Sequence, residues 1–503
     1  MGHYSGGFRG NDINRRIEIA LAQQAQRQKV QKAAGETISK AGITTTTGIT
    51  AYNLEAPTLG LVPTRTPGLE IIPRKTTHKG DLGVHWKSLT NLDQNLVAIG
   101  VSEGQRNASI NPYVTVQQAL FKTLGLEDDY TFEAEEAAES FDNVPMRSVE
   151  YLLAQFRIQE SRVAWNGVGS LPFGTTPTPT GTTGTAAGTL SSGGTYYLRA
   201  VALSFDGYNR ASVGGGVVQT YTRNNNDGSQ SILNGGSAIV SSASAAITAG
   251  TSPNASLNFK VAAVPGAAGY AIYVGTSTSN MTLAVISSSN TGTITALPAG
   301  TQLATTITTD CSADTLVYDG LVTQWSQSSS GAYFKSLDGA GFTSGNGGTI
   351  NEFNTAFEFL WGQGQAALRI RPTHIITGGT TRVSISNTIF GSAGPIFRTD
   401  IPPGEEVNSG NVVKAVMNPV TGDLVPIIVD PWFPQNQVAI FANSLPEYTI
   451  PEVPLPFNIM TRMRDYYQIV WPETTRTRFN GIYYSGVMQV RAPFAAAVLV
   501  NTP

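Results

Sequence analysis

The first apolar pattern along the chain lies in residues 11 to 40. Ile13, Ile17 and Leu21 follow one another at intervals of four, and a stretch rich in Gln, Lys and Arg continues to Gly35. A helix with so thin an apolar stripe draws its stability from packing on a partner. We therefore expect an N-terminal arm that contacts another molecule, with a frayed terminus as the alternative.

Between Gly60 and Asn111 the apolar residues favour extended segments. Leu69, Ile71 and Ile72 precede a polar stretch, and Val84, Trp86 and Leu89 follow it in approximate alternation. This pattern predicts a long hairpin. Its tip would carry five polar side chains: Arg74, Lys75, His78, Lys79 and Asp81. Because such a tip cannot bury itself in its own core, we expect it to be solvated or to rest on another subunit.

Helical spacing returns in three later segments. The first joins Val116, Ala119, Leu120 and Leu124 on one face and ends at Gly125. A clearer helix begins at Ser148, has Val149, Leu152, Leu153, Phe156 and Val163 on its apolar positions, and ends at Asn166-Gly167. A third begins near Thr349, with Ile350, Phe353, Phe357 and Leu360 on one face. Glycine directly after the apolar period is a common helix terminator.

An acidic run with no Lys or Arg lies between Lys122 and Arg147. Its members are Glu127, Asp128, Asp129, Glu133, Glu135, Glu136, Glu139 and Asp142. Such a cluster is typical of a solvated face, and the alternative is contact with a basic surface on a neighbour. The candidates for inter-subunit contact are Glu133 and Glu136 here, and Arg476 and Arg478 near the other end of the chain.

Residues 175 to 311 differ in composition from the rest of the chain. They hold only four basic and three acidic residues, and they begin with a linker rich in Thr, Pro and Gly. Four segments within them have the pattern of strands: TYYLRAVALS, GGVVQTYT, SLNFKVAAV and GYAIYVGT. Strands at this spacing, separated by Gly, Asn and Ser turns, predict a small sandwich. After residue 373, short strands alternate with proline-rich turns, so we expect an α+β host interrupted by an all-β insert.

Composition excludes several classes of protein. The chain has 503 residues, 41% hydrophobic and 13% charged, with a formal net charge of −3. A chain of that length can bury a large core. Its slightly negative net charge lacks the excess of positive charge that is typical of a dedicated nucleic-acid binder. Cys311 is the single cysteine, so no intrachain disulfide forms. No apolar run is long enough to span a membrane, and we expect a soluble protein without a membrane partner.

The chain offers no catalytic motif. Its four histidines (His3, His78, His85 and His374) include no ligand-spaced pair, and the pattern GxxxxGK[ST] does not occur. The acidic run has many carboxylates, but a glycosidase needs two of them held in a cleft. GQGQAA at 362 to 367 matches the pattern GxGxxA. In a dinucleotide-binding site this glycine-rich turn is followed by a helix, and Pro372 leaves no room for one, so we treat the match as chance. We expect no enzyme activity, no metal and no cofactor.

Within residues 175 to 311 two segments resemble fibronectin type III domains. SLNFKVAAVPGAAGYAIYVGTS is similar to the B and C strands of that family, and GTYYLRAVALSFDGYNRAS is similar to its F and G strands. Here the F and G pair comes first. The order implies a circularly permuted or divergent immunoglobulin-like domain, which an insertion with neighbouring ends permits.

The host parts, read in order, resemble the major capsid proteins of tailed double-stranded-DNA bacteriophages, the Hong Kong 97-type fold. The order is an arm, an extended hairpin, a long helix that ends in a glycine turn, α+β domains and a last strand. The two most specific pieces are ESRVAWNGVGSLPFGTT, similar to the exit of the spine helix, and FNGIYYSGVMQVRAPFAAAVLV, similar to the closing strands. The resemblance covers residues 11 to 174 and 312 to 503.

The resemblance implies a domain division. It gives 1–60 as the N-terminal arm, 61–110 as the extended hairpin, 111–174 with 312–372 as the peripheral domain with the spine helix, 175–311 as the insert, and 373–503 as the axial domain with closing peripheral strands. No long charged scaffolding segment precedes residue 60, so a scaffold would be a separate protein or the arm itself. Lys79 and the Asn residues match no cross-linking motif.

The resemblance also implies a function. Copies of the chain would form hexamers and pentamers of an icosahedral shell, assembled in the cytoplasm of a host bacterium, with the insert on the outer face. Its partners would be other copies, a portal protein, scaffolding and decoration proteins, and packaged DNA by non-specific proximity. Two alternatives stay open: a phage tail or surface adhesin with a glycan-binding sandwich, and an enzyme with an appended fibronectin-like module.

Overall fold

The computed structural model describes most of the chain after residue 63. The described ranges are 64–77, 82–91, 100–107, 113–138, 143–297, 300–345, 349–363, 369–392, 412–445, 455–473 and 475–502. The predicted arm, with Ile13, Ile17 and Leu21, lies outside them. So do His78, Lys79 and Asp81 from the predicted hairpin tip.

One sheet of the host is built around the longest strand, β23 (Thr477–Val490). Its first ten residues pair antiparallel with β4 (Lys122–Thr131), while β22 and β21 pair with it on the other side and β1 adds parallel to β21. The bounds of those three strands are Arg74–Thr77 for β1, Phe457–Arg462 for β21 and Tyr467–Val470 for β22.

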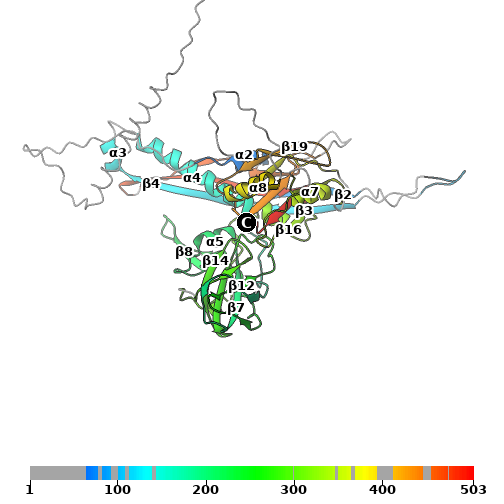
Figure 1. Cartoon of the computed structure of the whole chain (residues 1–503). Helices are drawn as coiled ribbons and strands as arrows, with labels where there is room; N and C mark the ends of the chain where they lie inside the picture. Colours follow the sequence, from blue (N-terminus) through cyan, green and yellow to red (C-terminus); the bar gives the residue numbers. More distant parts are fainter. Residues whose placement is uncertain are drawn as a thin grey trace, which may run out of the picture. The chain divides into compact units, whose positions relative to one another are not determined.

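The long helix α4 (Val144–Asn166) lies along this sheet (Figure 1). Asn143 caps its start by accepting a hydrogen bond from Met146 N at 3.1 Å, and Gly167 N closes its end on Val163 O at 2.8 Å. Leu152 and Phe156 are buried against the sheet. This is the helix predicted from Ser148 onwards, and it begins one turn earlier because the Asn143 cap and Pro145 favour a start there. The shorter helices nearby are α2 (Pro67–Ile71), α3 (Phe132–Ala138) and α6 (Leu321–Trp325).

A second host sheet has six strands in the order β16-β24-β20-β17-β19-β18. Their bounds are Tyr333–Ser336, Ala496–Val500, Gln437–Phe441, His374–Thr377, Leu424–Val429 and Ala415–Met417, respectively. The helix α7 (Asn351–Glu358) packs on this sheet and continues into a π-helical turn at Phe359–Gln363, and a 3-10 turn covers Pro493–Ala495. The predicted helix near Thr349 and the predicted strands after residue 373 are thus confirmed.

The helix α8 (Gly379–Ser392) has no counterpart in the sequence analysis. Its residues GTTRVSISNTIFGS are rich in β-branched side chains, which lower helix propensity, and they lack a clear apolar stripe. Its position beside the six-stranded sheet therefore depends on tertiary packing, since Ile385 is fully buried in the core beneath that sheet.

Aromatic rings fill the core shared by α4, α6 and the sheets. Trp165 packs edge-on against Trp325 and Phe433, and Trp325 also contacts Phe441 and Phe457, with ring centroids 5.6 to 6.2 Å apart. All five rings are almost fully buried. The end of α4 is therefore held in a buried cluster of contacting aromatic rings.

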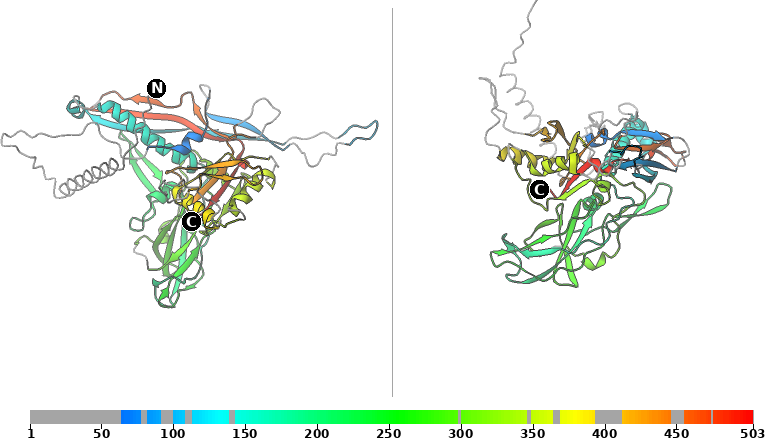
Figure 2. Two further views of the ribbon diagram at one scale, coloured as in Figure 1. Left: turned by 45° about the horizontal axis from the view of Figure 1, so that its top comes forward. Right: turned by 90° about the vertical axis from the view of Figure 1, so that its right-hand side faces the viewer.

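Residues 175 to 311 form two further sheets that share a core of their own (Figure 2). One has the order β10-β7-β13-β14 and the other β15-β12-β5. Their bounds are Ile247–Thr248, Thr195–Leu203, Gly269–Ser277 and Asn280–Ser287, then Thr291–Ile294, Leu257–Lys260 and Thr180–Thr183. Smaller elements are the pair β6 (Gly188–Thr189) and β11 (Asn254–Ala255), the hairpin β8 (Thr220–Asn224) and β9 (Gln230–Asn234), the helix α5 (Phe205–Arg210), and a 3-10 turn at Ala304–Thr306. The four predicted strands lie on or overlap β7, β8, β12 and β13.

Two predictions for residues 69 to 125 were wrong. The predicted hairpin arm at 69–72 is largely helix α2, and the predicted tip begins with β1, which pairs with β21. The hairpin exists one element later, formed by β2 (Gly83–Asn91) and β3 (Tyr113–Leu120). The predicted helix over 116–124 is therefore strand β3 followed by β4, because its Tyr-Val-Thr-Val start suits a pleated strand better than a helix.

Candidate functional site

The β2–β3 ribbon is a two-stranded sheet whose described strands pair only with each other. Its register sets Gly83 opposite Leu120, His85 opposite Gln118 and Lys87 opposite Val116. Alternate residues of a strand point to the same side of the sheet. Val114, Val116 and Leu120 of β3 are separated by even numbers of residues, so all three lie on one face of the ribbon.

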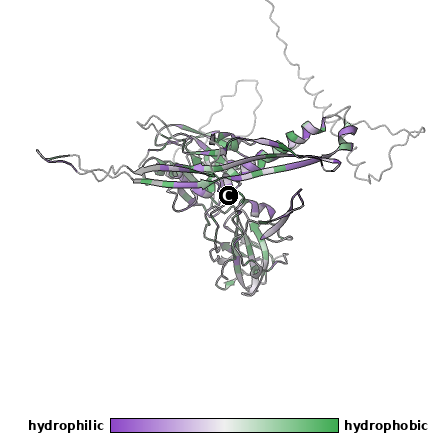
Figure 3. Cartoon of the chain, turned by 180° about the vertical axis from the view of Figure 1, so that it is seen from behind, coloured by the Kyte–Doolittle hydropathy of each residue, from purple (hydrophilic) through white to green (hydrophobic). Residues whose placement is uncertain are grey.

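That face exposes its apolar side chains. The exposed fractions are 48% for Val114, 67% for Val116 and 61% for Leu120. Figure 1 shows the ribbon running out past α7, and Figure 3 shows apolar segments along its projecting part. On the opposite face, Val84 is buried and Trp86 packs against the host core. The ribbon is thus anchored on one face near its base and leaves an apolar stripe on the other.

A buried carboxylate fixes the segment that leads to this ribbon. Asp430 accepts hydrogen bonds from Gly68 N at 2.9 Å and Trp432 N at 2.8 Å, with Ser161 Oγ at 3.4 Å. Burial raises the pKa of Asp430, and these donors counter the rise. A Cβ on Gly68 would meet Asp430 Oδ2 at 2.3 Å, so glycine permits this approach.

Arg74, the first residue of β1, forms a second anchor. Its guanidinium pairs with Glu160 of α4 and with Asp465, and it donates to Tyr466 Oη at 2.6 Å. Tyr466 also donates to Glu160, whose side chain is fully buried. The guanidinium carbon lies 4.7 Å from the centre of the Tyr466 ring.

This network shifts the pKa values of its members. Burial raises the pKa of Glu160, while Arg74 and the Tyr466 hydroxyl act against that rise. Burial is the largest single influence on Arg74 and lowers its pKa, but Glu160, Tyr466, Asp465 and Tyr484 together outweigh burial and hold that pKa above its ordinary value. Arg74 was predicted at an exposed hairpin tip; it is instead half-buried and joins β1 to α4 within the chain.

The acidic run contacts basic residues of the same chain. Arg476 Nη2 lies 2.6 Å from Glu133 Oε1, and Arg478 Nη1 lies 2.7 Å from Glu135 Oε2. Arg478 Nε also donates to Glu473 at 2.8 Å. Because α3 follows β4, the pairing of β4 with β23 brings these two distant segments together.

Two other predicted contact residues are on the surface of the host. Lys75 is exposed on β1, and Glu136 is exposed on α3. The structure brings Glu133, Arg476 and Arg478 into one region, while Arg74 belongs to the buried network. The apolar stripe on β3 was missed as a candidate, since its residues had been assigned to a helix face.

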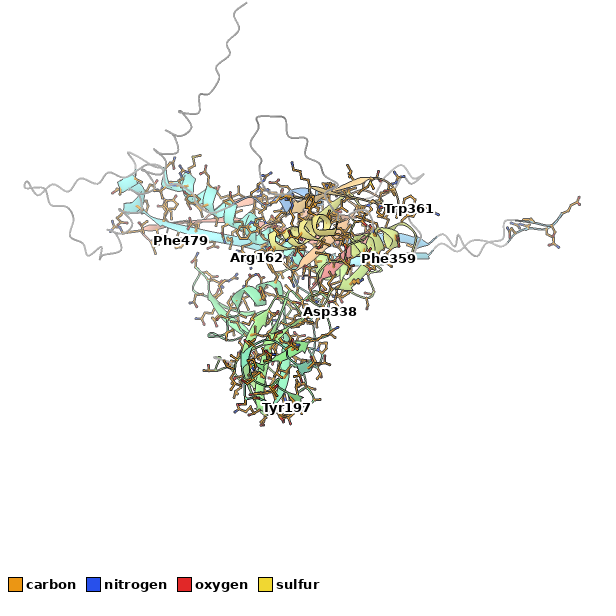
Figure 4. The ribbon with its side chains drawn as sticks, in the orientation of Figure 1. Arg162, Tyr197, Asp338, Phe359, Trp361 and Phe479 are labelled. Atoms are coloured by element: carbon orange, nitrogen blue, oxygen red, sulfur yellow. The ribbon has the colours of Figure 1, made fainter. Side chains whose placement is uncertain are left out.

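A polar joint connects residues 175 to 311 with the host, and Asp338 is at its centre (Figure 4). Lys260 Nζ and Asn290 Nδ2 each lie 2.7 Å from the Asp338 carboxylate, and Ser336 Oγ donates to it at 2.6 Å. Gln437 Nε2 adds a buried hydrogen bond to Ala267 O at 3.1 Å. These contacts tie the insert to the host through charged and neutral polar groups.

Among the described residues, no group of three or more His, Cys, Asp or Glu side chains is placed to hold a metal ion. None of the described helices is both long and apolar enough to cross a membrane. Cys311 is buried, and burial raises the pKa of its thiol.

No protein-family model matches the chain, and no curated protein sequence matches it. Solved structures do show a likeness. A structure of Microbacterium phage Oxtober96 has 8% identity and a TM-score of 0.42, with 90% of this chain and 95% of that chain covered. The capsid of a native GTA particle has 7% identity and a TM-score of 0.41 over the same shares. An encapsulin complex from Synechococcus elongatus has 6% identity and a TM-score of 0.38, with 90% and 92% covered.

Proposed function

We propose that the chain is the major subunit of an icosahedral shell that encloses packaged double-stranded DNA. Copies would assemble as hexamers and pentamers. The proposal rests on the resemblance of the two host segments to tailed-phage capsid proteins and on exposed apolar surfaces that neighbouring copies would cover.

The observation that carries the proposal is the β2–β3 ribbon. An isolated two-stranded ribbon is marginally stable in water, and a sheet edge with exposed apolar residues promotes association. Val114, Val116 and Leu120 would be covered by a neighbouring subunit. The buried contacts of Arg74 and Asp430 support this role, because they attach the segment that precedes the ribbon to the host core.

A second surface at the edge of the six-stranded sheet also supports assembly. β18 is the edge strand, and Met417 lies directly opposite Leu424 on β19, with both side chains exposed. A closed shell requires each subunit to make several distinct contacts with its neighbours. Two separate apolar edges fit that requirement better than one.

Strand pairing within residues 175 to 311 supports an immunoglobulin-like insert. In such domains strands C, F and G share one sheet, and A, B and E share the other. The order β13-β7-β10 fits C-F-G, and β5-β12-β15 fits A-B-E. We assign these residues to a permuted sandwich displayed on the outer face of the shell.

The domain division of the sequence analysis stays part of this proposal, with the hairpin moved to β2 and β3. The arm with Ile13, Ile17 and Leu21 would contact a neighbour, and Glu136, Lys75 and the paired Glu133 and Arg476 would lie on inter-subunit surfaces. Portal, scaffolding and decoration proteins would bind the assembled shell, and DNA would lie inside it.

The test is assembly of the full chain, expressed in bacteria alone and with a scaffolding protein, and examined by light scattering and negative-stain microscopy. Val116→Asp places a charge in the exposed stripe and should prevent particle formation while the thermal melting temperature stays within a few degrees. Ile232→Asp is the matched control, since Ile232 is 77% exposed but lies on β9 of the insert. Particles formed equally by both variants, or a monomeric wild type under every condition, would refute the proposal.

A further inference from the structure

A groove lies between the β8–β9 hairpin of the insert and the part of the host sheet formed by β4, β23 and the residues that follow β22. The cavity has a volume of about 740 Å³. Figure 1 shows β8 directed towards β4, and Asn226 at the hairpin turn donates to Glu127 Oε2 of β4 at 2.8 Å. We propose that this groove is a binding site for a neutral oligosaccharide.

The floor of the groove is aromatic. Phe479, Tyr483 and Trp471 line it, and the Trp471 side chain is 41% exposed. Phe479 and Tyr483 are four residues apart on β23, so they lie on the same face of the sheet. Tyr467, the cross-strand partner of Tyr483, stacks on it with 6.2 Å between ring centroids.

Two glycines keep this floor flat. A Cβ on Gly125 would lie 2.0 Å from Tyr483 Cδ1, and one on Gly481 would lie 2.5 Å from Tyr483 Cε2. The ring of Tyr483 therefore rests on the bare backbone of β4 and β23. Its hydroxyl donates to Glu127, which fixes its orientation.

The wall of the groove carries planar polar groups: amides, a carboxylate and a guanidinium. It is formed by residues at the end of β8 and in the turn that follows: Arg223, Asn224, Asn225, Asn226 and Asp227. Internal hydrogen bonds hold the turn, with Arg223 Nε donating to Asn225 Oδ1 at 3.0 Å and Asn225 Nδ2 donating to Ser231 Oγ at 2.9 Å. The wall is thus rigid before any ligand binds, which lowers the entropic cost of binding.

The two sides match the chemistry of a sugar ring. A pyranose presents C–H groups on one face, which pack on the negative face of an aromatic ring, and hydroxyls at its edge, which pair with amide, carboxylate and guanidinium groups. The cavity falls within the usual range for small-ligand sites, roughly 300–1,000 Å³, and combines an apolar floor with polar groups that would orient a ligand. The wall carries both signs of charge, one cation and acidic neighbours, so we assign a neutral ligand.

The experiment uses the full chain on a microarray of bacterial and plant oligosaccharides, with hits measured by calorimetry on the free glycan. Wild type should bind at least one neutral pyranose oligomer, and Trp471→Ala should weaken that binding at least tenfold. Trp361→Ala is the matched control: Trp361 lies beside α7 rather than in the groove, and this variant should bind as wild type does (Figure 4).

Three outcomes would overturn the proposal: no glycan bound by the wild type, equal binding by Trp471→Ala and wild type, or equal loss in both tryptophan variants. Binding only to acidic glycans would also contradict the neutral ligand assigned here. Near-identical melting temperatures of the two variants would confirm that a difference in binding arises in the groove and not from unfolding. None of these measurements requires particle assembly. They therefore test the proposed glycan site independently of the proposed shell function.

Discussion

The ring of Tyr483 lies against the backbone of Gly125, its direct partner across the pair formed by β23 and β4. Gly125 does not end a helix, as its place in the sequence had suggested; it makes room for an aromatic ring. The relationship links the sheet that supports α4 to the groove beside the insert, since both depend on the same flat surface.

Replacing Gly125 by Ala should destabilise the protein. The added Cβ would overlap the Tyr483 ring, and forced repacking of this kind costs about 1–3 kcal/mol. Thermal and urea denaturation of the purified chain would measure the change. Gly341→Ala is the matched control, because a Cβ built there has no atom within 4 Å other than those of Gly341 and its neighbours in the chain. Equal stability of the two variants would show that Tyr483 moves aside freely.

Arg74→Ala should be more damaging. It leaves the fully buried Glu160 carboxylate without its cation, and loss of one partner of a buried ion pair costs about 3–5 kcal/mol. The free energy of unfolding from urea titration is the measurement.

The control for Arg74 is Arg476→Ala, which removes an exposed partner of Glu133 and should cost less than about 1 kcal/mol. A loss of similar size in both variants would contradict the assignment of Arg74 to a buried anchor.

The sequence was sufficient to locate elements with strong local signals. The helix α4 has an apolar period, an Asn cap and a glycine stop, and β7, β13 and β23 have long β-rich runs. The sequence was insufficient where the apolar residues of one stretch fit both the helical and the strand periodicity. The apolar residues at 116, 119, 120 and 124 match one face of a helix. Residues 113–120 nevertheless form a strand, because they pair with β2.

The Arg74 network was beyond reach from the sequence for a different reason. Its partners Glu160 and Asp465 are 86 and 391 residues away, and no local pattern joins them. A single arginine in a polar stretch is predicted to be solvated. Its buried partners become evident only from the pairing of β1 with β21 in the folded sheet. The same holds for Glu133 and Arg476, whose proximity follows from the pairing of β4 with β23.

Asp338→Asn should weaken the joint with the insert in a pH-dependent manner. Burial raises the pKa of Asp338, but hydrogen bonds from Lys260, Ser336 and Asn290 outweigh it and hold the pKa below its ordinary value. A lowered folded-state pKa means that the unfolded chain binds the proton more tightly. The carboxylate therefore stabilises the fold above its unfolded pKa of about 3.9, and this contribution is lost as the pH falls through the folded pKa.

The measurement is the difference in unfolding free energy between wild type and Asp338→Asn, taken by urea titration at pH 6, 4 and 3. The difference should be largest at pH 6 and should shrink at the lower values, because both proteins then carry a neutral side chain at this position. A constant or growing difference would contradict the role given to the charge.

Deletion of residues 175 to 311 should leave the host folded. The two ends of the insert lie side by side, since Phe173 N donates to Ser312 Oγ at 2.9 Å and Gly174 N donates to Asp310 Oδ2 at 2.6 Å. A short Gly/Ser bridge can therefore replace the insert without strain. The buried clusters of the insert and of the host contain no common residue, so the deletion removes both clusters of the insert and leaves both clusters of the host complete.

The deletion variant should keep the cooperative thermal transition of the host and, under the proposed function, should still assemble into particles seen by negative-stain microscopy. Host groups at the joint, such as Gln437 and Asp338, lose partners but become accessible to water, so their desolvation cost is removed together with their hydrogen bonds. An insoluble or unfolded product would show that the two cores are interdependent. A folded product that no longer assembles would place part of the inter-subunit contact on the insert.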